Sequence, residues 1–123
     1  MLVLLDENLL SRKLKQPLVE AGYTVYNVDN MGWRGTKDRD LLALSDAYPF
    51  DVFITADKNL PYQQKISDYR LRIVVLNTKT TKPDCLHDLI EQICPILSTL
   101  VPGSITLIDD DREITPFQEQ NLE

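Results

Sequence analysis

Residues 1–8 read MLVLLDEN, and this stretch decides the fold. Four apolar residues, from Leu2 to Leu5, are followed directly by two carboxylates and a carboxamide. A short continuous apolar run with polar ends is typical of a fully buried strand, most simply at the centre of a parallel sheet. Open α/β sheets bind ligands beyond the carboxyl ends of their strands. Asp6 and Glu7 therefore stand at a candidate site, unless Asp6 only ends the strand and caps the following helix.

The composition is that of one ordinary globular domain. The chain has 123 residues, of which 43% are hydrophobic and 26% are charged. It contains no apolar stretch long enough to span a membrane, and its N-terminus lacks the basic region and cleavage site of a signal peptide. We expect a cytoplasmic protein with no membrane partner.

The net charge of −6 is unevenly distributed along the chain. Residues 109–123 carry six acids and one arginine, whereas the other 108 residues carry 13 acids and 12 lysines and arginines. Total charge therefore does not exclude a substrate with a phosphate backbone. We expect one domain over residues 1–108, followed by an acidic, flexible tail over residues 109–123.

Apolar periodicity and turn residues predict an alternation of strands and helices along the rest of the chain. This alternation indicates a three-layer α/β/α fold with a central, mainly parallel, five-stranded sheet and right-handed crossovers. We expect the last strand at an edge of the sheet, and kinks at the two prolines inside helices, Pro17 and Pro95. The predicted strands cover residues 2–5, 23–28, 52–55, 72–76 and 104–108, and the predicted helices cover residues 10–21, 38–47, 59–67 and 84–100.

Four acids are candidates for one shared site. Asp6 and Asp57 follow the first and third strands, whose carboxyl ends lie on the same side of a parallel sheet. Asp38 and Asp40 open the helix that leads away from that side. Converging carboxylates repel each other, and Mg²⁺ or Mn²⁺ relieves the repulsion because hard oxygen ligands suit these ions. Such an ion activates water, which makes phosphodiester hydrolysis the predicted reaction.

The sequence lacks the catalytic residues that other reaction types require. His87 is the single histidine and is far in sequence from these acids, so a nucleophile activated by histidine has no good base. No glycine-rich phosphate-binding motif is present. A receiver domain of two-component signalling is an alternative, because it also carries acids after its first strand and a phospho-acceptor aspartate after its third. Its lysine after the fifth strand is missing here, where Ile108 is followed by Asp109.

The motifs together resemble the short bacterial PIN-like proteins, which are related to the toxin ribonucleases of toxin–antitoxin pairs. The resemblance is carried by LLDENL at residues 4–9, MGWRG at 31–35 with DLL at 40–42, and ITADKNL at 54–60 with the glutamine pair at 63–64. It implies a PIN-like fold and a cytoplasmic, Mg²⁺- or Mn²⁺-dependent endoribonuclease. It also implies RNA as the substrate, and a cognate antitoxin and a homodimer as partners.

The resemblance assigns roles to individual residues. Asp6 would be the principal metal ligand and Asp40 the catalytic acid of the helix. Asp57 would be the third catalytic acid, with Thr55 orienting ligands or phosphate. Asp38 occupies a neighbouring position that is often acidic, and is a further metal ligand or an N-cap.

A second set of residues is predicted to contact the substrate around these acids. Asn8 is equally a helix cap, the charged residues are equally solvated, and Trp33 either stacks on a base or fills the gap between its loop and the core. Because Asn77 stands where many PIN domains have a further acid, a catalytically weak binding module is a second alternative. The predicted substrate contacts are Glu7, Asn8, Arg34, Trp33, Thr55 and Lys58.

Overall fold

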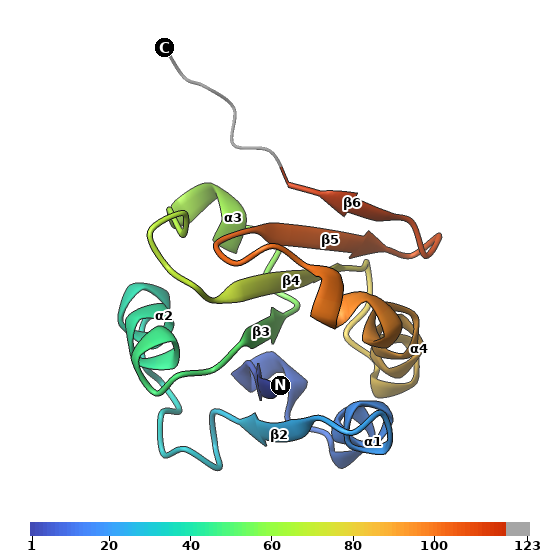
Figure 1. The fold of residues 1–123 in the computed structure, drawn as a ribbon. Helices are drawn as coiled ribbons and strands as arrows, with labels where there is room; N and C mark the ends of the chain where they lie inside the picture. Colours follow the sequence, from blue (N-terminus) through green and yellow to red (C-terminus); the bar gives the residue numbers. More distant parts are fainter. Residues whose placement is uncertain (118–123) are drawn as a thin grey trace.

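The structure is a computed structural model that describes residues 1–117. Its central element is a six-stranded sheet with the strand order β2-β1-β3-β4-β5-β6 (Figure 1). Strands β1 to β5 are parallel, and β6 pairs antiparallel with β5. The strands are β1 (Leu2–Leu5), β2 (Thr24–Asn27), β3 (Val52–Thr55), β4 (Arg72–Asn77), β5 (Ile105–Asp109) and β6 (Ile114–Pro116).

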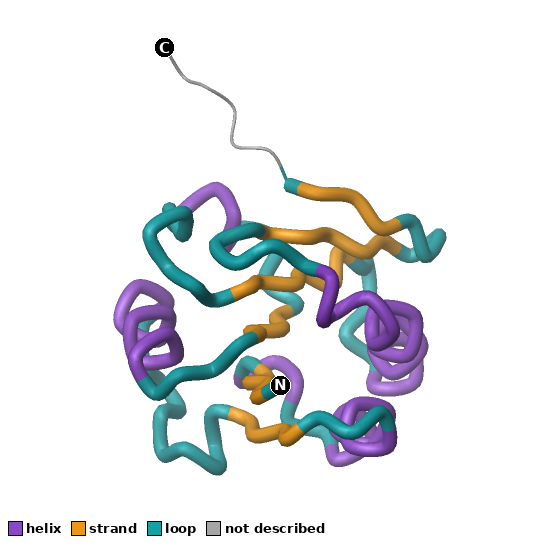
Figure 2. Tube along the Cα trace, viewed as in Figure 1, coloured by secondary structure: helices purple, strands orange, loops and turns teal. Residues whose placement is uncertain are grey.

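Helices lie on both faces of this sheet, which confirms the predicted α/β class (Figure 2). Helices α1 and α4 pack together on one face, and α2 and α3 lie on the other. The α-helices are α1 (Arg12–Glu20), α2 (Asp38–Ala47), α3 (Leu60–Gln63) and α4 (Pro83–Ile93). Two 3₁₀ segments, η1 (Glu7–Leu9) and η2 (Cys94–Thr99), precede α1 and follow α4.

The continuous apolar run of β1 is explained by burial on both sides. Val3 and Leu5 join the core between the sheet and helices α1 and α4, while Leu4 joins the core on the α2 and α3 side. All three side chains are completely buried. Successive residues of a strand point to opposite faces, so a strand covered on both faces needs an apolar residue at every position.

The sheet has six strands, so the prediction of five is wrong. The sixth, β6, lies within the segment that was expected to be a flexible tail, and it places β5 inside the sheet instead of at its edge. The acidic run forms the turn between β5 and β6, because Oδ1 of Asp109 accepts hydrogen bonds from the backbone N–H groups of Asp111 and Glu113, both at 2.9 Å. The rest of the predicted tail, residues 118–123, lies outside the described residues.

The helices also differ from the predicted ranges. Helix α1 begins only at Arg12 and continues past Pro17, whereas η1 occupies the turn before it. Helix α4 ends at Ile93, and the chain continues as the 3₁₀ segment η2, which contains Pro95. Because proline cannot donate the backbone hydrogen bond of an α-helix, the change of helix type falls where a kink was expected.

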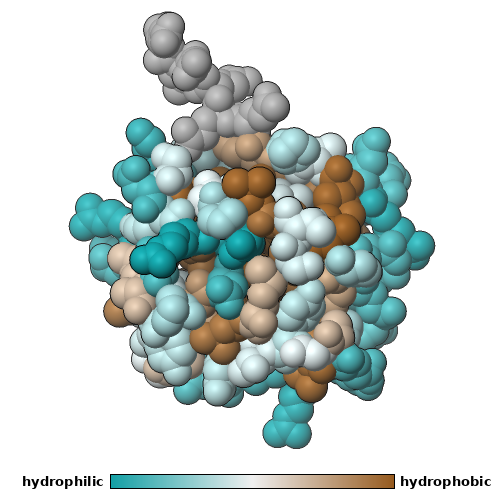
Figure 3. All heavy atoms as spheres, viewed as in Figure 1, coloured by the Kyte–Doolittle hydropathy of each residue, from teal (hydrophilic) through white to brown (hydrophobic). Residues whose placement is uncertain are grey.

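The molecular surface mixes polar and apolar residues. On the face shown in Figure 3, apolar residues form separate patches among hydrophilic ones. Within residues 1–117, no helix has both the length and the apolar character that a membrane crossing requires.

Candidate functional site: an acidic cluster at the carboxyl edge of the sheet

The strand order reverses its direction between β1 and β3. From β1 the chain crosses through α1 to β2, and from β3 it crosses through α3 to β4 on the other side. The two connections therefore lead away from each other, in opposite directions and on opposite faces of the sheet. Doubly wound sheets bind their ligands at such a switch point, outside the carboxyl ends of the strands. Asp6 directly follows β1 at this point, and Thr55 is the last residue of β3.

Asp6 is a buried carboxylate that is held on both sides. Its side chain is only 6% exposed. Oδ2 accepts a hydrogen bond from the hydroxyl of Thr55 at 2.7 Å, and Oδ1 accepts one from the backbone N–H of Glu7 at 2.8 Å. Asp6 therefore does cap the following 3₁₀ segment, with one oxygen, as the alternative interpretation proposed. Its other oxygen faces β3, so the cap and the site involve the same side chain.

Thr55 is the centre of the hydrogen-bond network beneath the site. Its fully buried hydroxyl accepts hydrogen bonds from the backbone N–H of Asp57 at 3.0 Å and from Nδ2 of Asn8 at 3.4 Å. Oδ1 of Asn8 in turn accepts a hydrogen bond from the backbone N–H of Ala56 at 3.2 Å. Asn8 thus connects the segment after β1 with the segment after β3. Its role is to fix the loop that carries Asp57, and it caps no helix.

Asp57 and Asp38 complete a cluster of three aspartates. Oδ1 of Asp57 accepts a hydrogen bond from the backbone N–H of Asn59 at 3.0 Å, which holds the start of the β3–α3 connection in a turn. Asp38 is the first residue of α2, and the charges of Asp6 and Asp57 both act on its carboxyl group. The cluster therefore draws one carboxylate from each of three segments that are distant in sequence.

Burial and mutual repulsion change the acidity of this cluster. The pKa of Asp6 is raised above its ordinary value, chiefly by burial, while the hydrogen bonds from Thr55 and Glu7 oppose the shift and the charges of Glu7 and Asp57 add to it. The pKa of Asp38 is also raised, first by burial and then by the charges of Asp6 and Asp57. The anionic forms are thus disfavoured, as expected for carboxylates that converge without a cation.

Asp40 does not join the cluster, although it was predicted to be the catalytic acid of the helix. It is exposed, and the acids whose charges act on Asp38 are Asp6, Asp57 and Glu7. Two residues along an α-helix correspond to a rotation of about 200°, so Asp38 and Asp40 point in nearly opposite directions. The structure therefore brings Asp38 to the site in place of Asp40.

The structure places the predicted substrate contacts in different surroundings. Glu7 is exposed at the rim of the cluster, and Lys58 is exposed directly after Asp57. Nη1 of Arg34 lies 4.0 Å from Oδ1 of Asp29 in the loop before α2. Trp33 packs edge-to-face on Tyr48 and Phe50 and covers the core on the α2 side. Of its two interpretations, filling the gap between loop and core is the one that the structure supports.

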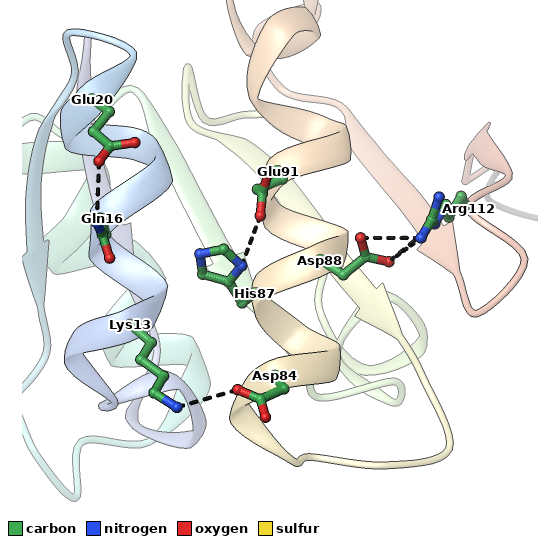
Figure 4. A network of polar contacts seen from close by, with 8 residues as sticks. All are labelled: Lys13, Gln16, Glu20, Asp84, His87, Asp88, Glu91 and Arg112. Atoms are coloured by element: carbon green, nitrogen blue, oxygen red, sulfur yellow. Dashed lines mark hydrogen bonds and ion pairs between the residues drawn. The ribbon is translucent and has the colours of Figure 1, made fainter.

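His87 belongs to a different region of the molecule. It lies on α4, on the face shared with α1, and its Nδ1 is 2.8 Å from Oε1 of Glu91 (Figure 4). The groups that alter the pKa of Asp6 and of Asp38 do not include it. The sequence-based view that the acids act without a histidine base agrees with this placement.

The chemistry of the donors suits a hard divalent cation, because the cluster presents only carboxylate, hydroxyl and carboxamide oxygens. In the part of the chain that the structure describes, however, no three acid, histidine or cysteine side chains are arranged to hold a metal ion as they stand. Both oxygens of Asp6 and one of Asp57 are engaged in hydrogen bonds. Bringing Asp6, Asp38 and Asp57 onto one ion therefore requires at least one of these side chains to rotate.

Sequence reasoning missed two features of this edge. It gave the catalytic role on the helix to Asp40 and only a neighbouring role to Asp38, and it left Phe117 in a flexible tail. Phe117 instead packs edge-to-face on Tyr62, with ring centroids 5.2 Å apart, in the segment that follows Asp57. The signal for the second feature was present, because Ile114 and Phe117 are apolar residues within an otherwise polar and acidic stretch.

Comparisons of the chain with protein-family models, with curated proteins and with solved structures found no match. The geometry and chemistry of the acidic cluster are therefore the basis for inferring a function.

Proposed function

We propose that this protein is a PIN-like, Mg²⁺- or Mn²⁺-dependent endoribonuclease whose metal ligands are Asp6, Asp38 and Asp57. The observation that carries the proposal is the convergence of these three carboxylates at the switch point of the sheet. Within residues 1–117 none of them forms an ion pair with a basic side chain. The pKa values of two of them, Asp6 and Asp38, are raised, and acids with perturbed pKa values are more frequent at functional sites than elsewhere.

Each residue of the proposed site has a separate role. Asp6, buried and oriented by Thr55, is the fixed ligand, while Asp38 and Asp57 are less buried and close in from α2 and from the loop after β3. A bound divalent ion supplies a water molecule of lowered pKa and neutralises charge on the phosphodiester. Asn8 and Thr55 hold the segments that follow β1 and β3 in register. Asp40, on the outer side of α2, takes no part.

RNA is the proposed substrate because the resemblance to PIN-like ribonucleases and the acid cluster agree on hydrolysis of a phosphodiester. Lys58 and Arg34 are exposed and can meet the phosphate backbone of the strand. The antitoxin and the homodimer remain predictions from the resemblance alone.

The decisive experiment follows the cleavage of end-labelled single-stranded RNAs of varied sequence with Mn²⁺ and with EDTA. We expect wild-type protein to cleave with Mn²⁺ only. Asp6→Asn should reduce the rate by about 100-fold or more, since removing a residue that merely supports a metal ligand already costs 10- to 100-fold. Asp88→Asn, which alters a paired surface acid on α4, is the matched control and should keep full activity.

Two other outcomes separate the alternatives. If RNA of every sequence stays intact with Mn²⁺, the nuclease proposal fails, and metal affinity without cleavage would then identify a binding module. Incorporation of phosphate at Asp57 from a small phosphodonor would instead identify a receiver-like domain. The order of the five parallel strands, 2-1-3-4-5, is one that doubly wound signalling domains also have. Against that function, Asp109 stands at the end of β5 where receiver domains carry lysine.

A further inference from the structure

A small pocket lies beside the acidic cluster, on the α3 side of the sheet. Its volume is about 160 Å³, and it is lined by the β3–α3 connection, the carboxyl half of β4, β5 and the residue after β6. Lys58, the residue after Asp57, is part of its rim. The pocket therefore begins one residue after Asp57, a proposed metal ligand. A nucleotide next to a phosphate at the cluster would lie near this pocket.

Aromatic and apolar groups form the body of the pocket. Val75 is completely buried and contributes to the pocket lining together with a leucine of β5. Tyr62 has 78% of its surface exposed, the largest fraction among the exposed large hydrophobic residues of the described chain. Its ring stands at 89° to that of Phe117, so Phe117 supports the tyrosine in an edge-to-face contact while most of the tyrosine stays open to solvent. A supported and exposed aromatic ring is the kind of platform on which bases stack.

Two carboxamides complete the pocket. Asn59 and Asn77 are both exposed, and in the described part of the chain neither side-chain amide makes an intramolecular hydrogen bond. A carboxamide offers both donors and an acceptor, which is the pattern that pairs with the edge of a base. At about 160 Å³, the pocket is smaller than the roughly 300 Å³ at which drug-sized sites begin, so its occupant is one small planar group.

We infer that this pocket binds a single nucleobase of single-stranded RNA next to the cleaved phosphate, with the base stacked on Tyr62 and its edge bound by Asn59 and Asn77. Lys58 meets the adjoining phosphate. The inference rests on the proposed ribonuclease function for its substrate class, and it adds the subsite that decides which nucleotide lies beside the metal site.

The first test measures binding in EDTA, where no metal-dependent cleavage can occur. A fluorescently labelled short single-stranded RNA is titrated with the full chain, and its anisotropy is followed. Tyr62→Ala should weaken binding by roughly 5- to 150-fold, the range measured for loss of one stacked base. Tyr62→Phe should bind like wild type, because it keeps the ring. Tyr26→Ala is the matched control, since this tyrosine lies on β2, at the opposite edge of the sheet, and its loss should leave the affinity unchanged.

A second variant, Asn77→Ala, and an NMR experiment on the wild-type protein test the pocket even if Tyr62→Ala does not fold. Asn77→Ala should weaken binding by roughly 2- to 12-fold, the equivalent of one ordinary hydrogen bond. In ¹⁵N-resolved NMR spectra with EDTA, nucleoside 5′-monophosphates should shift the side-chain amide signals of Asn59 and Asn77. Ribose 5-phosphate, which has no base, should leave these signals in place.

The outcomes separate this inference from the proposed function. Equal binding by Tyr62→Ala and wild type, or equal shifts with ribose 5-phosphate and the nucleotides, would overturn the base pocket even if wild type cleaves RNA. Base-dependent binding by a protein that cleaves no RNA would support the pocket and would overturn the nuclease proposal alone.

Discussion

Acidic side chains are used in opposite ways in two regions of this molecule. On the face of α1 and α4 they pair with basic groups: Asp84 with Lys13 at 3.2 Å, Asp88 with Arg112 at 3.0 Å and Glu91 with His87 at 2.8 Å (Figure 4). At the carboxyl edge of the sheet the aspartates of the cluster instead lie near enough for their charges to repel one another. In the described chain no ion pair involves any of them.

The difference separates acids that are paired with basic groups at the surface from acids that are not. Exposed ion pairs contribute about 0–1 kcal/mol each to stability. The paired charges on the α1–α4 face therefore change the free energy of unfolding little. In the cluster, by contrast, Asp6 is almost completely buried and its pKa is raised, first by burial and in addition by neighbouring acids. Burial and like charges make this arrangement unfavourable without a cation, and this supports the proposed metal site.

The comparison between the paired acids on α4 and the unpaired acids of the cluster is tested first by metal binding. Stabilisation of the folded state by Mn²⁺ is the largest effect that we expect. A ligand that binds only the folded state at 100 times its dissociation constant raises the free energy of unfolding by about 2.7 kcal/mol. We expect Mn²⁺ to raise the melting temperature of wild type relative to EDTA, and to do so for Asp88→Asn as well. Asp57→Asn should lose most of the gain. An equal Mn²⁺ effect in both variants, measured by calorimetry, would place the ion outside the cluster.

The next effect concerns the hydroxyl that supports the cluster. Thr55→Val keeps the shape of the side chain but removes the donor to Asp6 and the acceptor for the backbone of Asp57. Leaving buried polar groups without partners costs about 1–3 kcal/mol, so urea denaturation should show a loss of stability of that size. Thr99→Val is the control, because the hydroxyl of Thr99 is exposed and bonds only the nearby carbonyl of Ile96. A loss as small as that of the control would show that Thr55 does not hold the cluster together.

The acids of the cluster also show which parts of the site could be predicted from the sequence. The places of Asp6 and Asp57 followed from two apolar runs that each end in a polar segment, because parallel strands bring their carboxyl ends to one edge. The choice between Asp38 and Asp40 depended on the rotation of α2 about its axis relative to the sheet. That rotation is set by how Leu41 and Leu42 pack into the core, and the local spacing of acids does not encode it.

The C-terminal segment shows a second limit. Acidic composition suggested a flexible tail, yet Asp109 uses its side chain to close a turn and Arg112 bonds Asp88 on α4. These are contacts between residues of opposite charge or between a side chain and the backbone, and total charge does not reveal them. The short apolar pair formed by Ile114 and Phe117 was the local signal for β6 and for the pocket beside it.

A smaller effect is expected when single charges are neutralised in each region without metal. Asp57→Asn keeps an oxygen for the backbone N–H of Asn59 and removes a charge that repels Asp6 and Asp38. Asp88→Asn removes a charge that attracts Arg112. Stability in EDTA should therefore rise in the first variant and fall in the second, each by up to about 1 kcal/mol. A loss of stability in both would mean that the charge of Asp57 is favourable as it stands.

The smallest effect is the dependence of stability on pH. The pKa values of Asp6 and Asp38 are raised above 3.8, so between 3.8 and the native pKa the folded protein binds more protons than the unfolded chain. The free energy of unfolding therefore falls as the pH rises through this window and increases on acidification. The lowered pKa of Asp110, whose carboxylate accepts a hydrogen bond from Thr78, acts in the opposite direction, but only below about 3.8.

Urea denaturation in EDTA at about pH 7 and about pH 4, just above the ordinary value of 3.8, measures this difference. Wild type should gain more stability on acidification than Asp38→Asn, which lacks one shifted carboxyl and relieves the repulsion on the others. Because Asp38 is partly exposed, solvent screening keeps this difference small. Asp88→Asn should respond to pH like wild type. If the stability of Asp38→Asn also changed with pH as that of wild type does, the carboxyl of Asp38 would not be coupled to the other acids of the cluster.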